Sequence, residues 1–443
     1  MPEVKADSEL GSIRAQLNSR EMSSSQWEVV LLCTAINMLD GYDVLVMSFA
    51  AAPVAADWRL DPASLGLLLS AGLIGMAFGS VLLGSLADAL GRKRLVNVCL
   101  VIVTIGMMAS ALSQSQLQLL ALRFVTGIGI GGMLATITAL VSEYSNDKRR
   151  GICMGLLQSG YPLGALLGGV IAAYIIQFSE WRSLFLFGGA VSAVLLPLII
   201  VRLPESLDFL SRSDMSGSGN AREKLLERFG LSEPRDSVAK EVDRSVGNWR
   251  SCFTPSDVGI NTLLLWSCYL ALMFSFYFVV SWTPKLLVDA GLSTSQGISA
   301  GAILQAGGLI GALVIGLLGS RYAVNKLAAW FFSLSVVFIL AYGWADAELM
   351  TLMILAALMG FFLIGAMIGL YTIAPALYDS KSRVTGVGLA IGVGRSGAIA
   401  APFVGGLMLE ANLEVSLIYA VFAAPLVLAA FAVRSISMPM SFR

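Results

Sequence analysis

The chain has 443 residues, of which 57% are hydrophobic and only 13% are charged, and its net charge is zero. Soluble domains carry about 25% charged residues, so this composition excludes an ordinary soluble protein and predicts a polytopic membrane protein. The lipid bilayer is therefore its expected environment, and we expect no nucleic-acid partner.

Apolar stretches of the length that a helix needs to cross the hydrocarbon recur between polar or charged breaks. Twelve of them lie near residues 27–53, 64–87, 95–114, 117–142, 151–177, 183–202, 258–284, 298–319, 326–344, 349–373, 384–408 and 415–434. The sequence thus predicts an all-α membrane protein with twelve transmembrane helices.

One long polar break separates the sixth span from the seventh. It contains "AREKLLERFG", in which Leu225, Leu226 and Phe229 recur at helical spacing and predict a short amphipathic helix at the membrane surface. The predicted organisation is an N-terminal segment 1–26, a six-helix bundle 27–203, a linker 204–257, a second six-helix bundle 258–435 and a tail 436–443.

The distribution of Lys and Arg predicts the orientation. Arg59, Arg182 and Lys285 fall in loops on one side, Arg123 and Arg395 lie within spans, and the remaining twenty-four belong to the termini and the opposite loops. By the positive-inside rule, both termini are cytoplasmic, in a bacterial inner membrane. The polar first 26 residues predict no cleaved signal.

The fifth and eleventh spans match at a constant offset of 237 residues. Six identities fall in nineteen positions, pairing Gly151 with Gly388, Gly155 with Gly392, Ser159 with Ser396, Gly160 with Gly397, Gly168 with Gly405 and Gly169 with Gly406. Small residues are common in packed membrane helices, which explains some of these coincidences, but we favour duplication. Two related halves with a central site are the architecture of a secondary transporter, with a central cavity between the halves.

The loop after the second span reads "GSLADALGRKR". Gly84 and Gly91 permit close helix approach and a tight turn, and Asp88 can face the positive N-terminus of a neighbouring helix, for which we favour the eleventh span. The segment resembles the cytoplasmic signature of the major facilitator superfamily. That resemblance implies that Arg92 reaches Glu143, and that this cytoplasmic gate latches the two halves together.

A second reading of the basic run stays open. Arg92, Lys93 and Arg94 can serve only to set the topology of the loop.

Two acids, Asp40 and Asp43, interrupt the otherwise apolar first span. A charge at the middle of the bilayer costs about 2.5–3.5 kcal/mol on insertion scales, so such residues are usually functional. Three residues apart, they lie on one side of the helix. Neighbouring like charges disfavour double ionisation, and the chain has no histidine, so we predict that these carboxylates carry the coupling proton. The alternative is that both pair with arginines and only hold helices together.

Arg123 and Arg395 are the intramembrane cations. Arginine stays charged and its planar fork grips a carboxylate with two hydrogen bonds. Glycines surround Arg395 in "GVGRSGAIAAP", so we predict that it holds the substrate carboxylate. Arg123 is either a partner of the acids or a residue that reaches the interface.

Three segments show a closer resemblance. "DGYD" in the first span, "RFVTGIGIGG" in the fourth and "TGVGLAIGVGRSGAIAAP" in the eleventh resemble the aromatic acid/proton symporter family. The resemblance covers essentially the whole membrane region and marks as functional Asp40, Asp43, Asp88, Arg123, Glu143 and Arg395. One departure concerns the fourth span, where family members tend to carry Pro-Asn and this chain has Leu134-Ala135, which weakens any transfer of substrate identity.

An aromatic acid needs flat apolar surfaces beside the arginine. The seventh span, "YLALMFSFYFVVSWTP", is rich in aromatic residues, most of which we expect to pack or face lipid. Further candidates are Tyr42 between the two acids and Gln158, which the repeat places opposite Arg395. The candidate substrate-binding residues are Arg395, Arg123, Tyr42, Gln158, Tyr269, Phe274 and Tyr277.

These features predict a transporter that imports small organic acids with protons, most plausibly benzoate-type aromatic carboxylates, by alternating access as a monomer. A carrier of a muconate-like acid and a drug/proton antiporter stay open as alternatives, although Arg395 argues against a carrier of cations. The chain has no histidine, metal-like cluster or phosphate loop, so we expect no enzymatic activity, no metal and no cofactor.

Overall fold

Helices make up nearly all of the described chain. The computed structural model describes residues 13–212, 226–230, 256–319, 321–345, 348–378 and 383–437, without the side chains of 85, 88, 89, 211, 212, 256–258, 383 and 384. The long helices are α2 (Ser24–Trp58), α3 (Pro62–Leu90), α4 (Arg92–Ala111), α5 (Gln116–Tyr144), α6 (Arg150–Ile175), α7 (Arg182–Arg202), α10 (Ser256–Asp289), α11 (Thr294–Leu318), α12 (Val324–Gly343), α13 (Leu349–Leu377), α14 (Arg383–Glu410) and α15 (Val415–Ser435). Twelve described helices have the length and apolar character of membrane spans, which confirms the prediction of twelve.

Most of these helices extend beyond the predicted apolar stretch, and α2 shows why. It starts at Ser24 because Ser23 caps it, accepting a hydrogen bond from the Gln26 backbone. It continues past Pro53 to Trp58, since a proline inside a membrane helix is tolerated where neighbours satisfy the freed carbonyl. The predicted span, 27–53, is therefore shorter than the helix at both ends.

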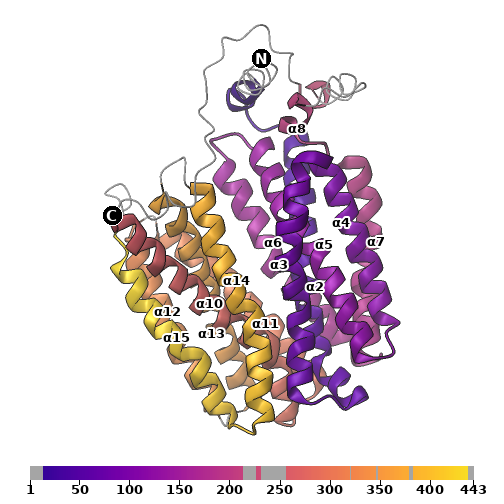
Figure 1. Cartoon of the computed structure of the whole chain (residues 1–443), viewed down its shortest axis with the longest axis vertical. Helices are drawn as coiled ribbons and strands as arrows, with labels where there is room; N and C mark the ends of the chain where they lie inside the picture. Colours follow the sequence, from indigo (N-terminus) through magenta and orange to yellow (C-terminus); the bar gives the residue numbers. More distant parts are fainter. Residues whose placement is uncertain are drawn as a thin grey trace.

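The helices form two bundles, α2 to α7 and α10 to α15, which stand side by side (Figure 1). Between them, α3 packs against α14, α6 against α11 and α2 against α10. We call the end at which α2 begins and α15 ends the terminal end, and the opposite end the far end. The two bundles meet toward the far end and diverge toward the terminal end (Figure 1).

At the far end the two bundles are in close contact. A methyl group on Gly66 of α3 would lie 2.6 Å from the Pro402 carbonyl oxygen of α14. The Ser48 hydroxyl of α2 lies 2.8 Å from the carbonyl oxygens of both Val280 and Ser281 on α10. This end of the interface is therefore closed.

At the terminal end, the same helices face open space. A methyl group on Gly84 of α3 or Gly392 of α14 would meet no atom within 4 Å, and the same holds for Gly155 of α6 and Gly316 of α11. The predicted central cavity thus opens toward the terminal end.

Two short segments rest on the terminal end of the first bundle. Helix α8 (Leu207–Arg212) follows α7 directly, and residues 226–229 form one helical turn with Leu226 and Phe229 buried. The Phe229 ring lies 4.8 Å from that of Tyr144, so this part of the linker packs with its apolar side on the bundle. The rest of the predicted amphipathic helix, including Leu225, lies outside the described residues.

Candidate functional site

The Asp43 side chain is fixed by an ion pair inside the first bundle. Its Oδ1 and Oδ2 accept hydrogen bonds of 2.9 and 2.8 Å from the two terminal nitrogens of Arg123, which also donates to the Asp43 carbonyl oxygen. Both side chains are buried, with relative exposures of 0% and 3%. Charges out of water are tolerated when paired in such a two-pronged geometry. Of the two roles predicted for Arg123, the structure shows pairing with an acid.

A small cavity adjoins this pair. Its volume is about 10 Å³, and its lining includes Asp43, Arg123, Leu73 and Met76. That volume holds about one water molecule. The ion pair therefore supplies the polar side chains of a small cavity whose other lining residues are apolar or glycine.

Asp40, one turn earlier on α2, is buried without a comparable partner. Its relative exposure is 3%, and its Oδ1 has no hydrogen-bond partner among the described residues. Its charge interacts with those of Asp43 and Arg395 at longer range. A buried carboxylate that lacks a direct partner is more stable when it carries a proton than when it is charged. The two acids thus differ, because among the described residues Asp43 has a direct cationic partner and Asp40 has none.

Arg395 bridges the two bundles from α14. Its Nη1 donates to the Met76 carbonyl oxygen at 3.0 Å and to the Ser80 hydroxyl at 3.3 Å, both on α3. Ser80 in turn donates to the Ala77 carbonyl oxygen, which leaves its oxygen free to accept from the guanidinium. Arg395 is half-buried and its contacts in this conformation are to neutral oxygens, so its charge is available to an anion.

Tyrosines from three helices surround the space between Asp40 and Arg395. Tyr277 of α10 and Tyr371 of α13 lie within electrostatic range of Arg395, and Tyr161 of α6 lies within range of Asp40. The side chains of Tyr161 and Tyr277 also interact with each other. Such rings offer flat apolar faces together with polar edges.

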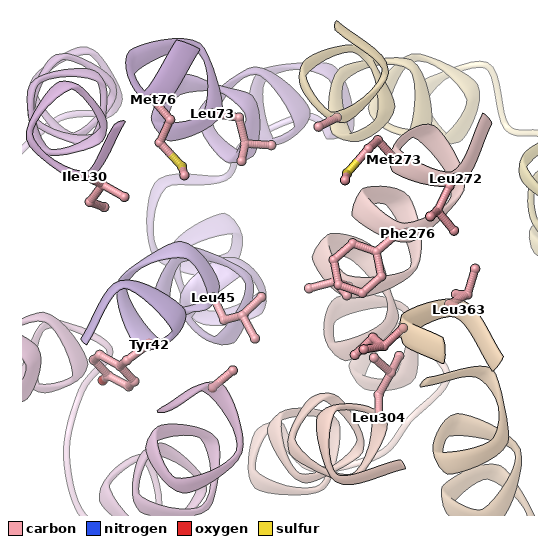
Figure 2. Close-up of a cluster of buried hydrophobic side chains, with 14 of the residues drawn as sticks. Tyr42, Leu45, Leu73, Met76, Ile130, Leu272, Met273, Phe276, Leu304 and Leu363 are labelled. Atoms are coloured by element: carbon pink, nitrogen blue, oxygen red, sulfur yellow. The ribbon is translucent and has the colours of Figure 1, made fainter. Parts of the chain in front are cut away.

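The apolar walls of the centre come from both bundles. Figure 2 shows Leu45, Leu73 and Met76 of the first bundle across from Met273, Phe276 and Leu304 of the second, all of them buried. A site with apolar walls and few polar groups suits a small organic ligand.

The predicted substrate-binding residues do not all reach this centre. Tyr269 is buried on α10 with an unpartnered hydroxyl, 6.0 Å between ring centroids from Tyr371. Phe274 stacks on Phe422 of α15 at 4.5 Å, so it packs within the second bundle. Gln158 is exposed on α6, near the glycines that face the opening.

Tyr42 packs inside the first bundle. Its hydroxyl donates to the Leu184 carbonyl oxygen of α7 at 2.7 Å, and its ring contacts Phe187 at 5.4 Å between centroids. In this conformation the side chain is thus committed to helix packing, and the site proposed below does not include it.

The predicted cytoplasmic gate residues lie at the terminal end of the first bundle. Arg92 of α4 forms an ion pair with Glu143 of α5, and Glu143 also accepts a 2.8 Å hydrogen bond from Ser206. Gly91 takes a φ of +90° at the turn between α3 and α4, a conformation that glycine adopts without strain. All of these contacts join helices of one bundle.

The latch between the halves stays a prediction. The side chain of Asp88 lies outside the described residues, and Gly84 faces the opening with no atom of another helix near it. A latch that involves them belongs to a conformation in which the terminal end is closed.

Sequence reasoning missed several polar groups at the centre. Asn37 donates to the Leu157 carbonyl oxygen but leaves its own Oδ1 unpartnered, and Gln305 of α11 is fully buried with neither amide atom paired among the described residues. The available signal for Gln305 was a single amide in the middle of an apolar helix. Tyr161 and Tyr371 gave no signal, because a tyrosine in such a helix usually packs.

The sequence matches known transport proteins along most of its length. A family profile described as the Major Facilitator Superfamily matches residues 30–348. The chain is 32% identical to the gallate transporter of Pseudomonas putida, over 95% of this chain and 94% of that protein. It is 33% identical to the 4-hydroxybenzoate transporter PcaK of Pseudomonas aeruginosa, with the same coverage of 95% and 94%.

A solved structure shows the same fold. The xylose transporter XylE from E. coli, in an inward open conformation, superposes with a TM-score of 0.73 at 16% identity, over 94% of this chain and 97% of that chain. At this identity, the likeness concerns the arrangement of helices alone.

Proposed function

The chain belongs to the major facilitator superfamily, as a multi-pass membrane transporter related to aromatic carboxylate transporters, and we propose that it imports aromatic acids together with protons. It is a transporter and not an enzyme. The observation that carries the proposal is the contrast at the centre of α2, where Asp43 is paired with Arg123 and Asp40 is buried without a direct partner.

Asp40 is the proposed proton carrier. Because Arg123 already neutralises Asp43, a proton is better placed on Asp40, whose unpartnered oxygen makes the charged form costly. Asp43 then has a supporting role: it fixes Arg123 and keeps a negative charge one turn from Asp40. Loss of the proton from Asp40 returns a charge to a site that only the more distant Arg395 compensates.

Arg395 is the proposed ligand of the substrate carboxylate. Its partners in this conformation are a carbonyl and a hydroxyl of α3, and an anion offers a stronger, charge-assisted hydrogen bond. Tyr277 and Tyr371 lie within electrostatic range of Arg395 and would supply aromatic faces for a ring. The names of the relatives support an aromatic acid as cargo.

The opening at the terminal end supports a direction. If the termini are cytoplasmic, as the Lys and Arg distribution predicts, this structure is the inward-facing state. In the outward-facing state, the proton binds Asp40 and the anion binds Arg395. Both charges are then neutralised, so the protein can close around a centre with almost no net charge. Opening to the cytoplasm then releases the substrate and the proton.

The test is uptake by purified protein in liposomes. Labelled benzoate and hydroxybenzoates, with muconate for comparison, are offered with and without an inward proton gradient. Accumulation of an aromatic acid that depends on the gradient is the expected result. Accumulation of muconate alone would contradict the proposed cargo. Uptake of an aromatic acid at the same level with and without the proton gradient would contradict the proton coupling.

Asp40→Asn separates coupling from binding. This neutral variant mimics the protonated acid, so it is expected to lose uphill uptake while retaining substrate exchange down its gradient. A variant that still accumulates substrate as the wild type does would show that Asp40 does not carry the proton.

A further inference from the structure

The side chain of Gln305 on α11 is unusual for its lack of partners. It is fully buried, and neither its Nε2 nor its Oε1 has a hydrogen-bond partner among the described residues. A buried amide in that condition is costly unless something completes its hydrogen bonds. Its isolation therefore points to a group that the protein itself does not supply.

Gln305 lies at the depth of the proposed site. Ala302 of α11 packs against Gly169 of α6, and the Ser295 hydroxyl donates to the Ala173 carbonyl oxygen, so the two helices run in opposite directions. Three residues beyond Ala302, Gln305 is about one turn nearer to Tyr161. Tyr161 is the tyrosine that lies within electrostatic range of Asp40.

Gln305 of α11 and Arg395 of α14 belong to two helices that both pack against α10. Their positions along the membrane can therefore be compared through the residues of α10 that each helix contacts. Pro284 of α10 contacts Gly297 and Gly301, which puts Gln305 level with about residue 278, while Gly394 packs beside Tyr269 and Met273. The two levels differ by about six residues, or about 9 Å along α10. Along the helix axis, this offset is within the reach of a benzene ring that carries a carboxylate at one end and a polar substituent at the other.

We propose that Gln305 binds a hydroxyl group on the ring of the substrate and so selects hydroxylated aromatic acids over benzoate. An amide donates and accepts, and so does a phenolic hydroxyl, so one substituent satisfies Gln305 where a ring hydrogen leaves it unpaired. Sites that bind a hydroxyl in this way reject the analogue that lacks it. This inference rests on the proposed function, with Arg395 holding the carboxylate at the other end.

The experiment compares Gln305→Leu with wild type in liposomes. Inhibition of labelled benzoate uptake by unlabelled benzoate and by 2-, 3- and 4-hydroxybenzoate gives their relative affinities. The wild type is expected to prefer at least one hydroxybenzoate by about tenfold, and Gln305→Leu to lose that preference while still taking up benzoate. Gln118→Leu makes the same change at an exposed position on α5 and is expected to keep the wild-type preference.

The possible results separate this inference from the proposed function. Benzoate uptake with an unchanged hydroxyl preference in Gln305→Leu would overturn the role of Gln305 alone, as would an equal loss of affinity for all four acids. A wild type that takes up none of them would overturn the proposed function. If Gln305→Leu does not fold, Gln305→Met serves instead, and a wild type that binds benzoate as tightly as every hydroxybenzoate overturns the inference without any variant.

Discussion

Each of the two bundles consists of six long helices, but they place different charges at the centre. The first contributes the acids, with Asp43 tied to Arg123 inside the bundle and Asp40 next to them. The second contributes a single arginine, Arg395, whose described hydrogen bonds reach across to the first bundle. In the first bundle, the Asp43 charge is neutralised by Arg123 of the same bundle. In the second, the hydrogen bonds of Arg395 go to neutral oxygens, so its charge has no direct anionic partner among the described residues. The two bundles thus differ in where the partners of their central charges lie.

Arg123→Leu is the strongest test of this difference. It leaves Asp43 buried without its partner, which is expected to destabilise the protein by about 3–5 kcal/mol, measured by thermal or denaturant unfolding in detergent. The double variant with Asp43→Asn is expected to recover part of the loss, because it leaves no buried charge. Arg395→Leu, which removes bonds to neutral oxygens from a half-buried side chain, is expected to cost far less. Equal destabilisation by the two single variants would contradict the comparison.

Arg395→Leu is expected to have its main effect on substrate binding. A hydrogen bond to a charged group contributes about 1.5–3 kcal/mol, so the affinity for an aromatic acid should fall by about 10- to 150-fold. Arg395→Lys keeps the charge without the planar fork and should fall between the variant and the wild type. The measurement is the Kd for a labelled acid on purified protein.

Arg434→Gln is the control for this prediction. It removes an exposed arginine at the end of α15 and is expected to leave the Kd unchanged. An Arg395→Leu protein that binds as tightly as the control would show that the second bundle does not hold the carboxylate.

Ser80→Ala sharpens the comparison with the smallest change. It removes the 3.3 Å hydrogen bond to Arg395 and leaves the one to the Met76 carbonyl oxygen in place. An anion that binds Arg395 then has one competing hydrogen bond fewer to replace. We expect the affinity for substrate to rise about two- to threefold, near the lower limit for one hydrogen bond. Ser333→Ala, at an exposed serine of α12 that bonds only within its own helix, is the control. Weaker binding in Ser80→Ala would mean that the hydroxyl helps to hold the substrate.

The helices were predictable and the polar contacts between them were less so. Apolar runs gave the twelve spans because the bilayer demands both the length and the composition. The two acids and two arginines stood out because charges there are costly. Their pairing did not follow from the sequence, since Arg123 and Asp43 come together only through the packing of α5 against α2.

Aromatic residues show the limit of sequence reasoning most clearly. Tyr42 looked like a cavity residue because it lies between two acids, yet its position on the helix turns it toward Leu184 and Phe187. Tyr161 and Tyr371 were not among the candidates, yet they lie within electrostatic range of Asp40 and Arg395. The direction of a side chain around a helix depends on which neighbours surround that helix, and a uniformly apolar helix carries little pattern that reveals them.

The sequence by itself determined that this chain has twelve membrane spans, that two acids and two arginines lie within them, and that an arginine lies in each half. These conclusions follow from local composition and from the cost of charge in hydrocarbon. Only the tertiary structure decided that Arg395 spans the interface and that the cavity opens at the terminal end. It alone also decided that, among the described residues, Asp43 has an ion-pair partner while Asp40 has none and Gln305 has no hydrogen-bond partner. Each of these depends on distances between helices far apart in the chain, which pairwise packing sets and local composition does not encode.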